Sequence, residues 1–199
     1  MAEICNNDIT NDMLLDCDNT AVAGIEVNVL LVNSKDINRT TTAFDATNKL
    51  LCTNFDLNAG KKGFLIQGVK QIFSASAELV KKEMGFDKWK HTFTGVILNM
   101  SADNLLQLQQ MSEGANLVAV IETKFKGEDN KDAFHILGYK QGLELATATW
   151  SSNENEGTVQ IELSSVDGYE EPNYVATLLE TDYDTTKTAF DNKFLAPSS

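Results

Sequence analysis

The chain has 199 residues, 42% of them hydrophobic and 23% charged, a composition that predicts one folded domain and excludes a disordered chain. No run approaches the roughly 18 apolar residues of a membrane-spanning helix, and the first ten residues, MAEICNNDIT, lack the basic and apolar regions of a secretory signal. We therefore expect a protein made and kept in a cytoplasm, without a membrane partner.

The net charge of −13 is concentrated at the two ends of the chain. Residues 1–34 contain six acidic and no basic residues, residues 153–199 contain ten acidic and two basic residues, and the segment between them is nearly balanced. Such ends repel a phosphate backbone, and Arg39 is the only arginine, which argues against sequence-specific nucleic-acid binding. The acidic ends serve either solubility or electrostatic contact with a partner, and the sequence leaves both open.

The first half of the chain predicts strands after a polar N-terminal arm, residues 1–24. Ile25–Val32 is rich in β-branched residues and predicts a strand. Residues 63–73 and 91–100 also predict strands, the former with an interior glycine, Gly68, that is typical of a bulge or a close backbone approach. Residues 75–84 fit both a helix and a strand, and that choice stays open.

Residues 101–114 give the strongest helix signal. Ser101 is a suitable N-cap, Asp103 lies in the first turn, and Gly114 ends the pattern. The apolar residues between them are spaced for contact mainly on one face: Leu105, Leu106, Leu108 and Met111.

The second half predicts consecutive antiparallel hairpins. Residues 117–125 and 133–139 flank the polar turn KGEDNKD, and residues 142–150 and 158–164 flank SSNENEG. In residues 158–164, Val159, Ile161 and Leu163 alternate with polar residues, which predicts one buried face. Consecutive hairpins with one helix between strands predict a mainly β fold, an antiparallel β-sandwich or barrel with one flanking helix.

The organisation expected from these patterns is an N-terminal arm (residues 1–24), a β-sandwich or barrel domain (residues 25–180) and a C-terminal arm (residues 181–199). The last segment, TDYDTTKTAFDNKFLAPSS, has few apolar residues. We expect it to lie outside the core and to become ordered on a partner.

The sequence predicts no catalytic, cofactor-binding or metal site. The chain has an odd number of cysteines, and their spacing is not that of a metal site. We therefore expect free thiols at Cys5, Cys17 and Cys52. The only histidines, His91 and His135, fall on separate predicted strands and are expected to be structural. Trp89 and Trp150 are interpreted as core or interface anchors.

One segment gives an enzymatic alternative. MLLDCDNTA contains Asp16, Asp18 and Thr20 after an apolar triplet, and it is similar to the first motif of haloacid-dehalogenase-type phosphotransferases. In that family the first aspartate is the nucleophile, and the chemistry also requires magnesium and a parallel α/β sheet. Ser34, Lys131, Asp129 and Asp132 are available by residue type, but their sequence context is wrong, and an acidic turn in the arm is favoured.

The stretch from Asn99 to the tail resembles virion structural proteins of tailed phages from gut bacteria, in particular the second half of tail-tube-like subunits. The resemblance rests on a hairpin return, a later strand end and an acidic Pro motif: Gly138, Tyr139, Gly142, Leu143 and Glu144; Leu163, Ser164, Ser165 and Gly168; Glu170, Glu171 and Pro172. It covers about half of the chain and does not separate a tail tube from another head or tail component, such as a head decoration or connector protein.

The resemblance implies a non-catalytic subunit of the virion, assembled in the host bacterial cytoplasm. The expected partners are further copies of the chain, in stacked and usually hexameric rings, other tail or connector proteins, and DNA that passes through without specific binding. Ring closure would pair exposed sheet edges. The expected contacts between subunits are the N-terminal arm up to Asn33, the loop from Asn54 to Gly63 and the tail after Thr181.

Overall fold

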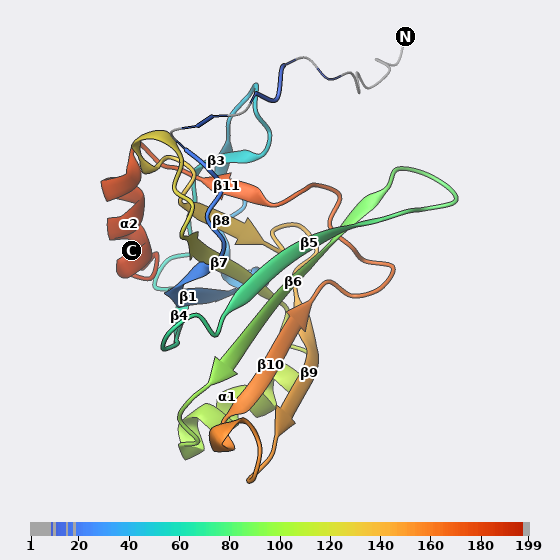
Figure 1. Cartoon of the computed structure of the whole chain (residues 1–199), viewed down its shortest axis with the longest axis vertical. Helices are drawn as coiled ribbons and strands as arrows, with labels where there is room; N and C mark the ends of the chain where they lie inside the picture. Colours follow the sequence, from blue (N-terminus) through green and yellow to red (C-terminus); the bar gives the residue numbers. More distant parts are fainter. Residues whose placement is uncertain (1–8, 10, 15, 18, 197–199) are drawn as a thin grey trace.

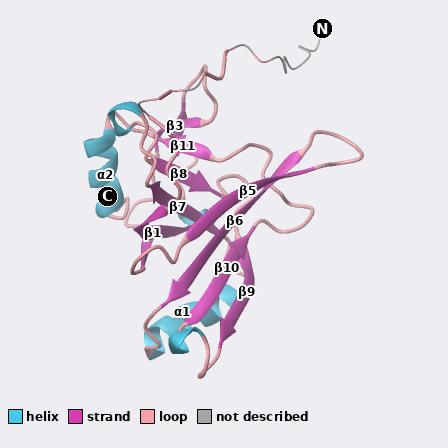
Figure 2. Cartoon of the chain, in the orientation of Figure 1, coloured by secondary structure: helices cyan, strands magenta, loops and turns pink. Residues whose placement is uncertain are grey.

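The computed structural model describes residues 9, 11–14, 16, 17 and 19–196. The described chain is mainly β, with two sheets stacked face to face and two α-helices at the periphery (Figures 1 and 2). The sequence-based expectation of an antiparallel β-sandwich with a flanking helix is therefore confirmed at the level of fold class.

The larger sheet has seven strands in the order β2-β3-β11-β8-β7-β1-β4. All its pairs are antiparallel except β11 with β3, which is parallel. Its strands are β1 (Ile25–Asn33), β2 (Ala43–Phe44), β3 (Leu51–Asn54), β4 (Phe64–Gln67), β7 (Leu117–Thr123), β8 (Phe134–Leu137) and β11 (Ala176–Leu178).

The smaller sheet has four antiparallel strands in the order β5-β6-β10-β9. They are β5 (Ser74–Val80), β6 (Lys88–Ile97), β9 (Glu144–Trp150) and β10 (Val159–Ser164). The β5–β6 hairpin extends well beyond the body of the sandwich, and α1 (Ala102–Ser112) lies at the opposite end of the same sheet, beside β9 (Figure 1).

The central strands of the larger sheet are buried on both faces, which explains their nearly continuous apolar sequences. In β1, Leu30 and Val32 face a core on the outer side of the sheet, whereas Val29 and Leu31 face the core between the sheets. The smaller sheet contributes Phe93 and Leu163 to the core between the sheets. The alternation predicted for residues 158–164 is confirmed, because Val159, Ile161 and Leu163 are all buried.

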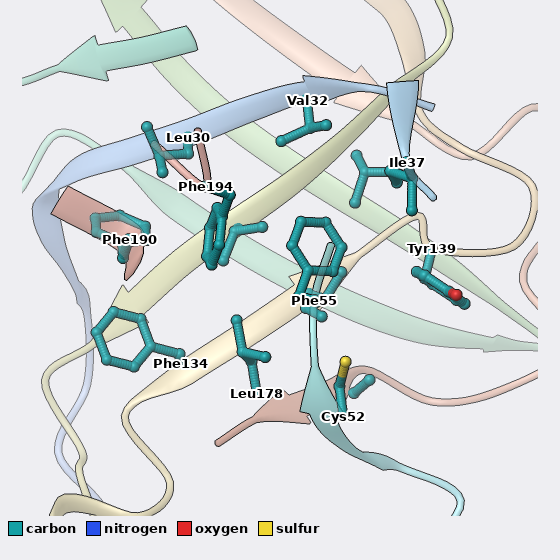
Figure 3. Packing of buried hydrophobic residues seen from close by; sticks show 14 of the residues in the cluster. Leu30, Val32, Ile37, Cys52, Phe55, Phe134, Tyr139, Leu178, Phe190 and Phe194 are labelled. Atoms are coloured by element: carbon teal, nitrogen blue, oxygen red, sulfur yellow. The ribbon is translucent and has the colours of Figure 1, made fainter. Parts of the chain in front are cut away.

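The C-terminal segment corrects an expectation, because it is part of the core. Helix α2 (Tyr183–Asp191) begins at Asp182, whose side chain accepts a hydrogen bond from the backbone N–H of Thr185. Phe190 is 2% exposed and packs against Phe134, with ring centroids 5.3 Å apart, and Phe194 is buried beside it (Figure 3). The segment contains few apolar residues, but two of them occupy the outer core, so residues 181–196 belong to the domain.

Two predicted segments have different bounds in the structure. Residues 63–73 do not form one strand, because β4 ends at Gln67 and a turn through Lys70, at φ 56°, leads into β5. A side chain at Gly68 would collide with the ring of Phe73, since a Cβ there would lie 2.8 Å from it. The ambiguous residues 75–84 form most of strand β5 and the turn that follows it.

Helix α1 forms where the sequence predicts it, but its apolar face is only partly covered by the chain. The Ser101 hydroxyl accepts a hydrogen bond from the backbone N–H of Asn104, as an N-cap does. No residue of α1 is fully buried, and Leu105 and Leu106 are exposed, whereas Leu108 is partly buried and Met111 packs against the core between the sheets. The predicted helix is therefore confirmed, and the predicted contact on one face holds for Leu108 and Met111 but not for Leu105 and Leu106.

Candidate assembly surface

The two edge strands of the smaller sheet, β5 and β9, each pair with another strand of the described chain on one side only. Strands β5 and β9 are seven residues long each, and neither pairs with a further strand among the described residues. By contrast, the edge strands of the larger sheet, β2 and β4, have only two and four residues. An unpaired edge presents free backbone N–H and C=O groups to any strand that approaches it.

The two long edges carry few of the features that usually prevent edge-to-edge pairing, although helix α1 lies beside β9. Residues 145–150 of β9 contain no charged residue and no proline, and β5 contains one charge, Glu78. The protection on β9 is a bulge near Ala146, where the register with β10 shifts between Glu162 and Leu163. Long edges without lysine or proline favour pairing with another chain.

The directions of the two edges suit head-to-tail pairing. Each neighbouring pair in the order β5-β6-β10-β9 is antiparallel, so β5 and β9 run in opposite directions. When copies are related by rotation about an axis, β9 of one copy approaches β5 of the next in an antiparallel orientation. Repetition of such a contact would close the sheets into one antiparallel barrel without free edges.

The face of the smaller sheet that points away from the core is rich in hydroxyl groups. The registers place Thr94 between Ser74 and Glu162, and Thr92 opposite Ser76. Five charged residues share this face, Glu78, Lys88, Lys90, Glu144 and Glu162, and Glu78 pairs in register with Lys90. The other members of the face are Val80, Val96, Gln160, Ser164, Thr147 and Thr149. Such a face is hydrated, and its three acidic and two basic residues nearly balance in charge.

The tip of the β5–β6 hairpin, residues 81–87, is held by ion pairs. Lys81 Nζ lies 2.6 Å from Asp87 Oδ2, and the backbone N–H of Lys82 donates to the same carboxylate. At the base of the tip, Lys82 Nζ lies 2.7 Å from Glu170 Oε1. Beyond these contacts Met84 and Phe86 project into solvent, with 92% and 74% of their surfaces exposed.

The acidic Pro motif of the sequence has a structural role. The buried Glu171 carboxylate accepts hydrogen bonds from the backbone N–H groups of Lys140, Gln141 and Gly142. The backbone of Glu171 also exchanges two hydrogen bonds with Trp89. Glu171 therefore joins the turn between β8 and β9 to strand β6, and it fixes the start of the β9 edge.

Of the segments expected to contact other subunits, some are exposed in the structure and others are part of the chain's own fold. The described residues of 9–24 form no helix or strand and are almost all exposed, whereas Ile25–Asn33 is an interior strand and is not free for a partner. In the loop from Asn54 to Gly63, Phe55 and Leu57 are buried. The tail contacts that loop within the same chain, since Gly63 N donates to Lys193 O.

The residues of the phosphotransferase alternative are only partly brought together. Asp16 and Thr20 line a surface hollow with Asp132, while Asp18 lies outside the described residues. Ser34 accepts a hydrogen bond from Arg39, and Lys131 pairs with the exposed Asp129. The fold is not the parallel α/β sheet that this chemistry requires, and Met13 and Leu14 lie in no strand.

The histidines, cysteines and tryptophans occupy separate places. His91 Nδ1 accepts from the backbone N–H of Gly138, and His135 Nδ1 lies 3.5 Å from the Thr177 hydroxyl. Cys52 is buried and Cys17 exposed, both as free thiols, and Cys5 is not described. Trp89 packs edge-on against Tyr174, whereas Trp150 is mostly exposed.

The described residues include no group of three or more histidine, cysteine or acidic side chains placed to hold a metal ion. In the same part of the chain, no helix has the length and apolar character needed to cross a membrane.

Comparisons of the chain with protein-family models, with curated proteins and with solved structures found no match.

Proposed function

We propose that the protein is a structural subunit of a tailed-phage virion that assembles into rings and forms part of the tail tube. The observation that carries the proposal is the pair of long, unpaired and oppositely directed edges, β5 and β9. Pairing of β9 with β5 of the next copy would remove both edges at once. The resemblance of residues 99 onward to tail-tube-like subunits supports six copies per ring.

In such a ring, the hydroxyl-rich face of the smaller sheet is the surface we assign to the lumen. It bears Glu78, Glu144 and Glu162 against Lys88 and Lys90, and its other side chains are neutral. The chain as a whole has a net charge of −13. A hydrated lumen in which three carboxylates outnumber two lysines would let DNA pass without being held.

The test is negative-stain electron microscopy of the concentrated protein, with two backbone variants of the β9 edge, Thr147→Pro and Ala148→Pro. Successive N–H groups of an edge strand point alternately toward β10 and away from it. One of the two prolines therefore removes only the outward donor, and that variant should keep the parent's thermal unfolding midpoint and lose the rings.

The matched control is Thr147→Ala, which removes the same hydroxyl but keeps the backbone donor, and it should form rings. Rings that persist in whichever proline variant remains folded would contradict edge pairing. A parent protein that stays monomeric at every concentration would instead point to a head decoration or connector protein that requires another partner.

A further inference from the structure

The β5–β6 tip, residues 81–87, carries an apolar surface that the chain itself does not cover. Met84 and Phe86 flank Gly85, whose φ of 93° sharpens the turn. The Lys81–Asp87 and Lys82–Glu170 ion pairs fix the base of the tip. Two large apolar side chains on a preorganised turn are expected to bind in an apolar recess, because little conformational entropy is lost on docking.

A recess of suitable chemistry lies between strand β4 and helix α1, and it is called the β4–α1 groove below. It has a volume of about 710 Å³, and its apolar lining includes Phe64, Leu65, Leu98 and Met111. Phe64, Leu65 and Leu98 are exposed in the single chain. The volume falls within the range of roughly 300–1,000 Å³ typical of pockets that enclose a compact ligand.

The charges of the two surfaces are complementary. Glu83, next to Met84 on the tip, is exposed, and Lys62 and Lys193 line the β4–α1 groove. Among the described residues none of these three side chains forms an ion pair within the chain. Docking of the tip would place the unpaired carboxylate near two unpaired ammonium groups.

The tip and the groove lie at opposite ends of the same strand. Residue 87 directly precedes β6, and Val96, Ile97 and Leu98, at its far end, line the groove. The ten residues of β6 separate the two surfaces by roughly 30 Å, and Figure 1 shows the tip and α1 at opposite ends of the smaller sheet. A chain cannot fill its own groove, but a copy displaced along β6 can.

We propose that the β5–β6 tip of one copy docks into the β4–α1 groove of a second copy, with Met84 and Phe86 as anchors and Glu83 facing Lys62 and Lys193. The contact joins two different surfaces, so it repeats along the β6 direction without closing and produces an open stack. It rests on the proposed function for its setting, since the β5–β9 contact would form rings and the tip contact would stack them.

The first test separates stacking from ring formation. The double variant Met84→Ser/Phe86→Ser should form single rings and no tubes, while Tyr169→Ser, which alters a residue 67% exposed outside the tip, should form tubes as the parent does. Glu83→Lys should shorten the tubes, and adding Lys62→Glu should restore them. Tubes of normal length from the double variant would overturn the proposal and leave ring formation standing.

The second test does not depend on rings and uses the β9 proline variant that remains folded and monomeric. Two versions of that chain are prepared: one carries Met84→Ser/Phe86→Ser and keeps its groove, and the other carries Leu98→Asp and keeps its tip. Nitrogen-15-labelled protein of the first kind is titrated with unlabelled protein of the second kind.

Saturable shifts of the amide resonances of Leu98 and Met111 are expected, and they should be absent when the added chain lacks both tip residues. If these resonances do not move at millimolar protein concentration, the tip does not bind the groove, whether or not the parent chain forms rings.

Discussion

Lys82 and Glu170 form a largely buried ion pair between residues 88 positions apart, with Nζ and Oε1 separated by 2.7 Å. The Lys82 hydrogen bond, aided by the backbone N–H of Gly168, lowers the pKa of the Glu170 carboxyl from 4.5 to about 2. The pair connects the base of the β5–β6 tip to the loop after β10, so it holds the direction in which the tip projects.

This ion pair should make stability depend on pH. Because the pKa of Glu170 is lower in the folded chain than in the unfolded chain, its contribution is complete above pH 4.5 and is lost as the pH falls toward about 2. We expect Lys82→Gln to lower the free energy of unfolding at pH 6 and to have little effect near pH 2, as measured by urea titration. Lys88→Gln is the control and should show no such change; an equal Lys82 effect at both pH values would contradict the assignment.

His91 should remain uncharged at neutral pH. Burial lowers its pKa from 6.5 to about 4, although the backbone of Asn173, which lies near the ring, acts in the opposite direction. The unfolded chain therefore binds a proton that the folded chain does not, and stability falls as the pH drops from 6.5 to about 4. Nitrogen-15 NMR of the imidazole groups measures this directly, and a His91 midpoint at or above 6.5 would exclude it.

Removing the charge of Glu171 should loosen the start of the β9 edge. In Glu171→Gln an amide group would face the backbone N–H groups of residues 140–142, and the loss of charge-assisted hydrogen bonds should cost about 1.5–3 kcal/mol of unfolding free energy. The exposed Glu128→Gln change serves as control and should cost little. Denaturant titration measures both, and equal costs would show that the carboxylate does not anchor the turn.

Phe190→Ala should destabilise the fold by about 3–5 kcal/mol, because it leaves a cavity beside Phe134 and Phe194 (Figure 3). Thr188→Ala, on the exposed side of α2, should change the free energy of unfolding by less than about 0.5 kcal/mol. Both values come from denaturant titration. If the two substitutions have similar effects, α2 is not part of the core as the structure indicates.

Local patterns of the sequence were enough to predict most of the strands, the hairpins between them and the helix after Ser101. The alternation of Val159, Ile161 and Leu163 with polar residues indicates a strand with one buried face. The Ser101 cap could be predicted because it depends only on contacts within one helical turn. The same patterns left residues 75–84 undecided, because pairing with β6 and not local preference makes β5 a strand.

Tertiary contacts decided the features on which the proposed assembly depends. The tail has a polar sequence, yet Phe190 is buried because β8 places Phe134 opposite it. In the sequence, Glu171 has the pattern of an exposed acidic residue. In the structure, its carboxylate accepts hydrogen bonds from the backbone N–H groups of residues 140–142. The sequence by itself determined strands with clear alternation, such as residues 159–163, since alternation follows from neighbouring residues. Only the folded chain determined that β5 and β9 are the free edges, since strand order depends on contacts between residues far apart in sequence.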